Sequence, residues 1–279
     1  MDHKEAYFNN QHGQSIFYQY WMPESKPKAA LLVIHGLNEH SGRYAHFADF
    51  FTANGYSVFA LDHIGHGKSD GTRSYIKKFS YYIDDIVTYI KMINDWFPDI
   101  PIYPVGHSLG GLINTYLLLD HQHLVRGAVL SGSVVLVPEY VSNFTIMIGK
   151  FISILFPKLG LLEIDKQSLS HDPEVVQAYI NDPLVFNGKI TVRVSSEMND
   201  AIERISLDGE KITLPVLILH GSEDKIVEPE CSKYLHGKIS SQEKDLIIYD
   251  GYFHEIFNEP EKELVFEDVL KWLNAQLSK

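Results

Sequence analysis

One serine of this chain lies in a pattern that could make its hydroxyl a nucleophile. Ser108 stands between Gly106-His107 and Leu109-Gly110, which gives the pattern G-x-S-x-G after an apolar run and before a helical one. In a tight strand-to-helix turn, this pattern lifts the serine above a sheet, where helix N–H groups face a developing anion. An ordinary glycine-rich turn would have the same composition. The strand before and the helix after favour the nucleophile.

A serine hydroxyl needs a base to take its proton, and the base needs an acid to orient it. Asp224 and His254 each follow a short apolar run, so each is predicted just after a strand. The chain order Ser, Asp, His is the one expected for this kind of turn. We therefore predict a triad of Ser108, Asp224 and His254. Two alternatives stay open: Glu223 could be the acid, and His254 could be a surface histidine.

A second polar cluster offers side chains that bind zinc or iron. It consists of residues 62–67, with the sequence DHIGHG, and of His35. Its glycines are typical turn residues, so an ordinary loop explains the segment. We predict no metal site, and acyl transfer by a serine requires neither a metal nor an organic cofactor.

Short β-rich apolar runs alternate with longer helical patterns, which indicates a mostly parallel sheet flanked by helices, an α/β fold. The first two runs predict an edge hairpin, with its turn at residues 10–14. Pro104 lies inside a predicted central strand, where its missing N–H should cost a hydrogen bond. The predicted strands are 6–9, 16–21, 30–35, 56–61, 102–105, 127–131, 216–220 and 245–249, and the predicted helices are 43–54, 81–96, 109–120 and 261–277.

The alternation stops at about residue 133 and resumes at about 205, and the segment between is mostly helical. We predict a core made of residues 1–132 and 206–279, with residues 133–205 inserted as a mainly helical cap. Such a cap would cover the carboxyl ends of the strands, where open α/β sheets bind their ligands.

The most apolar segment of the cap, residues 141–156, is too short to span a membrane and contains Lys150. It carries more large apolar side chains than one buried helix face needs. One interpretation is a helix that packs on the core. The other is a helix that lines an acyl-chain tunnel through Phe144, Ile148 and Phe151 and meets a lipid interface with its remaining surface.

Composition limits the partners of the chain. Hydrophobic residues make up 45% and charged residues 22% of it, as in folded globular proteins. A net charge of −12 without a basic run argues against nucleic acid. Cys231 is the single cysteine, which excludes an intramolecular disulfide and a thiolate metal cluster. The charged start does not resemble a signal peptide, so we expect a cytoplasmic protein with peripheral membrane contact through its cap.

Five segments resemble the monoglyceride lipase and lysophospholipase group of the α/β-hydrolase superfamily, and the resemblance extends over nearly the whole chain. They are 35–44 (HGLNEHSGRY), 62–69 (DHIGHGKS), 106–111 (GHSLGG), 221–224 (GSED) and His254. The first segment is the most specific, because its EHSGRY continuation is similar to monoglyceride lipases in particular.

This resemblance implies roles for further residues. The backbone N–H groups of Leu37 and Leu109 would form an oxyanion hole, and Glu39 and Arg43 would lie near the glycerol end of a substrate. From the residues alone, Glu39 and Arg43 could equally be a structural pair near a helix start. The chain departs from the family at Phe257, where some monoglyceride lipases have a second histidine close to the glycerol.

The predicted function is hydrolysis of carboxylic esters of small lipid-like substrates through an acyl-enzyme on Ser108. Monoacylglycerol is the first candidate substrate, with lysophospholipase, general carboxylesterase or thioesterase activity as alternatives. Because fold does not fix function, an aminopeptidase and a non-catalytic ligand-binding relative also stay open. A dehalogenase is disfavoured, since that chemistry requires an aspartate in place of Ser108.

Overall fold

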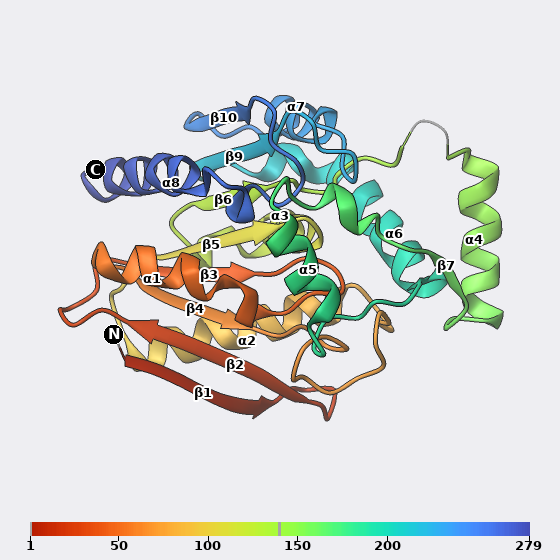
Figure 1. Cartoon of the computed structure of the whole chain (residues 1–279), viewed down its shortest axis with the longest axis horizontal. Coiled ribbons are helices and arrows are strands. Elements are labelled where there is room, and N and C mark those ends of the chain that lie inside the picture. Colours follow the sequence, from red (N-terminus) through yellow and green to blue (C-terminus); the bar gives the residue numbers. More distant parts are fainter. Residues whose placement is uncertain (1, 139–140) are drawn as a thin grey trace.

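The computed structural model describes residues 2–138 and 141–279. An eight-stranded sheet in the order β1-β2-β4-β3-β5-β6-β9-β10 runs through it (Figure 1). β2 is antiparallel to β1 and β4, and all other neighbours in this sheet are parallel. This confirms the predicted α/β fold class. The strands are β1 Asp2–Asn9, β2 Ser15–Met22, β3 Ala30–Ile34, β4 Ser57–Leu61, β5 Ile102–His107, β6 Ala128–Ser131, β9 Val216–Gly221 and β10 Lys244–Tyr249.

Helices cover both faces of the sheet. Every residue of β3 is buried, with Ala30, Leu32 and Ile34 in the cluster that includes α2 and α3, and Leu31 and Val33 in the cluster that includes α1 and α8. Successive side chains of a strand point to opposite faces, so a strand covered on both sides must be apolar throughout. The helices that flank the sheet are α1 Ala45–Ala53, α2 Ser80–Trp96, α3 Leu109–His121, α7 Glu230–Lys238 and α8 Lys262–Leu277.

Pro104 is tolerated in β5 because of where the pairing of that strand begins. The backbone O of Ile102 accepts from Arg126 N–H on the β6 side, and by alternation Pro104 faces the same side. The ladder between β5 and β6 starts only at Val105, one residue later. The missing N–H therefore lies outside the paired segment, and the expected loss of a ladder bond is avoided.

Residues 133–205 contribute no strand to the main sheet among the residues that the structure describes. They contain α4 Asn143–Leu155, α5 Pro173–Asn181 and most of α6 Val192–Asp208, and two short strands, β7 Gly160–Leu162 and β8 Ile190–Thr191, that pair only with each other. Figure 1 shows α5 near the end of the sheet to which β3 and β5 point, and α4 farther out. The division into a core (1–132 and 206–279) and a cap (133–205) is our interpretation of this arrangement. None of the helices described is both long and apolar enough to cross a membrane.

Candidate active site

Ser108 lies in the turn between β5 and α3 with a strained backbone. Its φ of 55° and ψ of −116° are unusual for a residue with a side chain. Two glycines make the turn sterically feasible. A Cβ on Gly110 would stand 1.8 Å from the backbone O of Ile34, and one on Gly106 would stand 2.4 Å from the backbone O of Gly110. The G-x-S-x-G pattern therefore forms the tight elbow that its sequence predicts.

Asp224 and His254 are hydrogen-bonded to each other. Nδ1 of His254 lies 2.6 Å from Oδ2 of Asp224, and both side chains are buried. The other carboxylate oxygen, Oδ1, accepts the N–H groups of Ile226 (2.8 Å) and Val227 (2.9 Å), which fixes its orientation. Glu223 is exposed, so it does not serve as the acid in this geometry. With its Nδ1 proton donated to Asp224, His254 has Nε2 left to accept a proton.

The pKa of Asp224 is lowered and the pKa of His254 is raised. Burial alone would raise the pKa of Asp224, but the imidazole of His254 and hydrogen bonds from His220, His254 and Val227 hold it well below its ordinary value. Burial alone would lower the pKa of His254, but the Asp224 carboxylate, with smaller contributions from Glu255 and Glu39, raises it above its ordinary value. An ionised Asp224 would stabilise an imidazolium formed at His254.

Ser108 and His254 line one small cavity at the carboxyl ends of the strands. Its volume is only about 30 Å³, against about 300–1,000 Å³ for a site that binds a small organic ligand. Three residues from the predicted cap, Ile164, Leu169 and Tyr179, form part of its wall. In this conformation the cavity is closed to anything as large as an acyl chain.

Leu37 and Leu109 lie where oxyanion donors are expected. Leu37 follows β3 and lines the same cavity, and Leu109 is the first residue of α3, directly after Ser108. Among the loop and turn hydrogen bonds of the described residues, neither backbone N–H has an acceptor. Both groups are therefore free to bind an anionic oxygen, and their role as donors remains a prediction.

Glu39 and Arg43 form the ion pair that was one of their two predicted roles. Arg43 Nη1 donates to Oε2 of Glu39 at 2.6 Å, and Glu39 also lines the cavity beside Ser108. The same guanidinium binds Glu255 through both nitrogens, each at 2.7 Å. The two residues thus form a buried ion pair, and Glu39 places one end of it in the cavity of Ser108.

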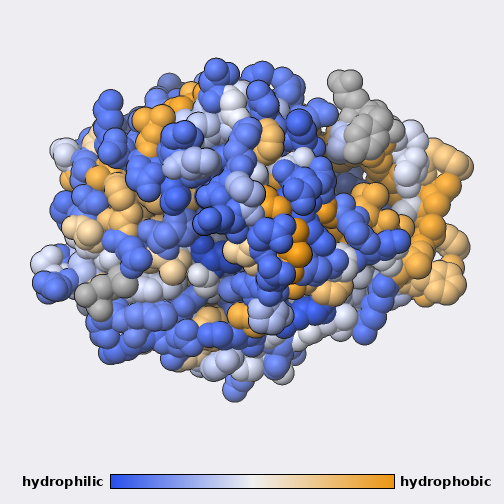
Figure 2. Space-filling model, in the orientation of Figure 1, coloured by the Kyte–Doolittle hydropathy of each residue, from blue (hydrophilic) through white to orange (hydrophobic). Residues whose placement is uncertain are grey.

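The structure does not bring Phe144, Ile148 and Phe151 to Ser108. All three are on α4, and none of them lines the cavity of the serine. Phe144 is 65% exposed and Phe151 is 64% exposed. Figure 2 shows hydrophobic atoms gathered at the edge of the molecule that α4 occupies in Figure 1. In this conformation they form an outer surface, in contrast to the predicted lining of an acyl-chain tunnel.

Three residues near the site were missed by the sequence analysis. Nε2 of His220 lies 3.1 Å from Oδ2 of Asp224, Glu255 follows His254 directly, and Tyr179 covers Arg43 with its ring 4.8 Å away. For His220 and Glu255, adjacency to the predicted acid loop and base was a usable signal. Tyr179 gave none, because it comes from a cap helix whose placement depends on tertiary packing.

The histidine cluster behaves as a hydrogen-bonded loop. Nε2 of His35 accepts the backbone N–H of His63 at 3.0 Å, and the ring of His66 lies 3.0 Å from the backbone O of Ile64 through Nδ1. Asp62 accepts the N–H groups of Ser41 and Lys68 at 2.8 and 2.7 Å. Bonds to backbone atoms thus account for Asp62 and for both ring nitrogens of His35, whereas Nδ1 of His63 and Nε2 of His66 are buried without a hydrogen-bond partner among the described residues.

Phe257, where the chain departs from its family, belongs to the core. It is buried and packs edge-on against Phe47, with Phe266 also nearby. The position of the family's second histidine is thus occupied here by an apolar ring of the core.

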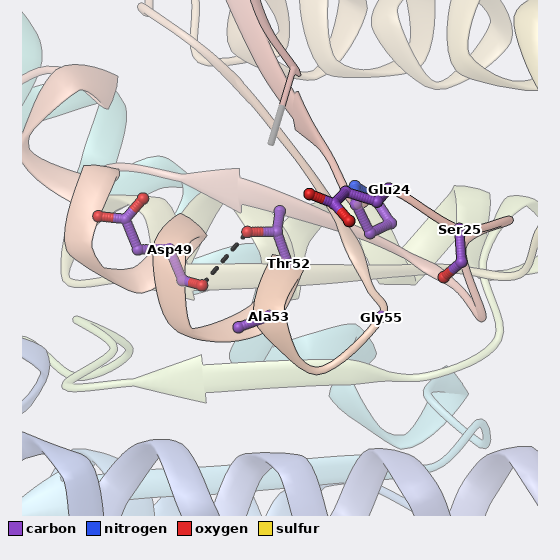
Figure 3. Close-up of a pocket in the computed structure, with 7 residues that line it drawn as sticks. Glu24, Ser25, Asp49, Thr52, Ala53 and Gly55 are labelled. Carbon is purple, nitrogen blue, oxygen red and sulfur yellow. Dashed lines mark hydrogen bonds between the residues drawn. The ribbon is translucent and has the colours of Figure 1, made fainter.

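A larger cleft of about 480 Å³ lies on another part of the surface, beside α1 (Figure 3). Its lining includes the carboxylates of Glu24 and Asp49 and no histidine, cysteine or lysine. The hydroxyl of Thr52 there donates to the backbone O of Ala48 at 2.7 Å and of Asp49 at 3.2 Å. Unlike the cavity of Ser108 and His254, this cleft pairs its serine, Ser25, with no histidine.

The chain is similar to known proteins over nearly its whole length. The family model described as serine aminopeptidase, S33, matches residues 25–261. The monoacylglycerol lipase of Mycolicibacterium smegmatis is 34% identical over 265 residues, 95% of each chain. The monoglyceride lipase of Homo sapiens is 33% identical over 270 residues, 96% of this chain and 89% of that one. The crystal structure of Paleococcus ferrophilus monoacylglycerol lipase is 29% identical, with a TM-score of 0.82 over 99% of this chain and 100% of that one.

These matches extend over both the core and the predicted cap, since the family model covers residues 25–261 and the relatives cover 95–99% of this chain. The chain therefore belongs to the serine aminopeptidase S33 family of serine hydrolases, as a monoacylglycerol lipase-like α/β-hydrolase.

Proposed function

We propose that this protein hydrolyses monoacylglycerols to glycerol and a fatty acid, with Ser108 as nucleophile, His254 as base and Asp224 as orienting acid. The observation that carries the proposal is the 2.6 Å bond between His254 and Asp224 beside the cavity that His254 shares with the strained Ser108. The lipase relatives described above support the choice of ester and substrate.

The reaction has two halves. Oγ of Ser108 attacks the ester carbonyl while Nε2 of His254 takes the hydroxyl proton, and the N–H groups of Leu37 and Leu109 bind the oxyanion. His254 then gives this proton to the departing glycerol oxygen, which leaves the acyl group on Ser108. Water attacks the acyl-enzyme, His254 takes its proton, and collapse of the second intermediate releases the fatty acid and restores the serine.

The charges beside the cavity favour a neutral head group. Glu39 and Glu255 flank a single guanidinium, that of Arg43, so this buried cluster has a net negative charge. A phosphate near this cluster would be repelled, whereas an uncharged glycerol would not. This supports monoacylglycerol over the lysophospholipid alternative, even though Phe257 leaves the site without the second histidine of some relatives.

The exposed apolar face of α4 supports a role at a lipid surface. Phe144, Phe151 and Ile154 are 65%, 64% and 69% exposed, an arrangement that is costly in water and favourable at a membrane interface. The closed cavity at Ser108 requires the cap to move before an acyl chain can enter. We propose that contact of α4 with lipid accompanies this opening.

The nucleophile is tested by intact-protein mass spectrometry after exposure to a fluorophosphonate. We expect one adduct on the wild-type protein and none on Ser108→Ala. A substrate panel of monoacylglycerols, lysophosphatidylcholine, a thioester and an aminoacyl anilide then tests the bond and the head group. The highest kcat/KM on monoacylglycerols supports the proposal. Preference for the anilide would assign an aminopeptidase, and no adduct on either protein would indicate a ligand-binding relative.

The lipid contact is tested by flotation with phosphatidylcholine vesicles. We expect wild-type protein to float and the double variant Phe144→Ser/Phe151→Ser to stay in the soluble fraction, with hydrolysis of a water-soluble ester unchanged. Leu264→Ser is the matched control, because Leu264 is 52% exposed on α8, away from the cap. Wild-type protein that does not float would refute the lipid contact and leave the esterase assignment intact.

A further inference from the structure

Glu255 links the predicted base to a second buried carboxylate. It follows His254 directly and is itself buried. Its two oxygens accept from Nη1 and Nη2 of Arg43 at 2.7 Å each. Nη1 of the same arginine also donates to Oε2 of Glu39 at 2.6 Å. One guanidinium therefore bridges the loop after β10 and the loop after β3.

The bridge continues to the backbone of the oxyanion loop. Oε1 of Glu39, the other oxygen of this carboxylate, accepts the N–H of Gly36 at 2.6 Å and the hydroxyl of Tyr44 at 2.9 Å. Gly36 precedes Leu37, one of the proposed oxyanion donors. An unbroken path of charge-assisted hydrogen bonds thus runs from the residue beside the base to the residue beside the oxyanion donor.

We propose that Glu255, Arg43 and Glu39 form a positioning clamp that holds the loop of His254 and the oxyanion loop at a fixed separation. The proposal rests on the function proposed above, since it explains how the base and the oxyanion donors of that reaction are kept at the right distance. Ser108 needs its base on one side and its oxyanion donors on the other, and a displacement of about 1 Å can cost on the order of 100-fold in rate.

The contacts of Arg43 favour a clamp over direct binding of a substrate. Its Nη1 and Nη2 atoms are both bonded to carboxylates, and its side chain is only 10% exposed. The ring of Tyr179, from α5, lies 4.8 Å from its guanidinium carbon. The N–H of Glu255 donates to the backbone O of Leu169 at 2.8 Å. The clamp is thus also fixed to the predicted cap.

The clamp also sets the charge around the base. The titratable groups that face His254 are Asp224, His107 with its ring 4.7 Å away, Glu255 and Glu39. Asp224 contributes most to raising the pKa of His254, and Glu255 and Glu39 add to it. Removing the charge of Glu255 should therefore lower the pKa of the base.

The test compares Glu255→Gln and Arg43→Lys with wild type on two substrates, a monoacylglycerol and p-nitrophenyl butyrate, which has no glycerol. Active sites are titrated with the fluorophosphonate, so that rates refer to folded enzyme. We expect both variants to lose about 10- to 100-fold in kcat, by the same factor on both esters. In Glu255→Gln the acid limb of kcat/KM should also move to lower pH.

The control is Asp120→Asn at a similar pair outside the site. Arg204 binds Asp120 through two contacts of 2.7 and 2.8 Å and lies 4.6 Å from the ring of Tyr116. We expect wild-type kcat from this variant.

A loss of kcat in Glu255→Gln and Arg43→Lys that is confined to the monoacylglycerol would overturn the clamp and make these residues head-group contacts. Wild-type kcat and pH profile in Glu255→Gln would overturn it as well. Failure of the proposed function is distinguishable, because the wild type would then not label or turn over.

Discussion

Two helices of this molecule, α3 and α4, each contain 13 residues and each begin after a serine, yet they are used in opposite ways. α3 is buried along nearly its whole length, whereas α4 exposes most of its large apolar side chains. Ser142 has an extended backbone and caps α4 by accepting the N–H of Thr145 at 3.1 Å. Ser108 makes no such bond and has a positive φ.

The two helix starts differ in whether the serine hydroxyl makes an N-cap hydrogen bond. A serine at an N-cap normally satisfies a backbone N–H and stabilises the helix by about 1 kcal/mol. Ser108 makes no such bond, so its hydroxyl is available for the proposed attack on an ester. The adjoining N–H groups are available for the proposed oxyanion. α3 compensates by burial against the sheet, while α4 keeps its cap and packs mainly against α6.

The largest expected effect comes from exchanging each serine for alanine. Ser108→Ala should reduce kcat by roughly 10⁴- to 10⁶-fold, because no other group can form the acyl-enzyme. Its free energy of unfolding should change by less than about 0.5 kcal/mol, since no cap bond is lost. Ser142→Ala should do the reverse, with wild-type kcat on a water-soluble ester and about 1 kcal/mol lost from helix α4. Steady-state rates measure kcat, urea denaturation measures the free energy of unfolding, and hydrogen exchange measures the stability of α4. A loss of kcat in Ser142→Ala would contradict the different roles of the two serines.

The next effect is on stability, with the same substitution in both helices. Ile113 of α3 is fully buried, so Ile113→Ala should cost about 2–5 kcal/mol in the free energy of unfolding through lost transfer energy and a cavity. Ile154 of α4 is 69% exposed, and Ile154→Ala should change stability by less than about 0.5 kcal/mol. Urea denaturation followed by circular dichroism measures both. A comparable loss in the two variants would mean that α4 is buried against a partner in solution.

The sequence was sufficient where the signals are local. The glycines around Ser108 and the short strands before Asp224 and His254 allowed prediction of the elbow and of the acid–histidine pair. It was insufficient for β1, where the prediction began at residue 6 but the strand begins at Asp2. The first residues of β1 are polar and exposed, and only backbone pairing with β2 makes them a strand.

Tertiary pairings had no local signal at all. Arg43 and Glu255 are 212 positions apart, and nothing near either residue indicates the other. The placement of α4 had the same limit. Its composition predicted an apolar helix, but not whether that surface would face the serine or the solvent, because this depends on the packing of α4 against α6.

The smallest predicted effect is a shift in pH dependence, and it concerns His254, the proposed base for Ser108 at the start of α3. His254 acts as a base only when neutral, and Asp224 raises its pKa above 6.5, so kcat/KM should rise with pH to a midpoint above 6.5. Asp224→Asn should lower that midpoint, because the burial of the imidazole is then offset less. Ser142→Ala should leave the midpoint unchanged. Profiles of kcat/KM between pH 5 and 9 on a water-soluble ester measure the shift. A wild-type midpoint below 6.5 would mean that burial outweighs the carboxylate, and that α3 presents its serine to a weaker base than this geometry indicates.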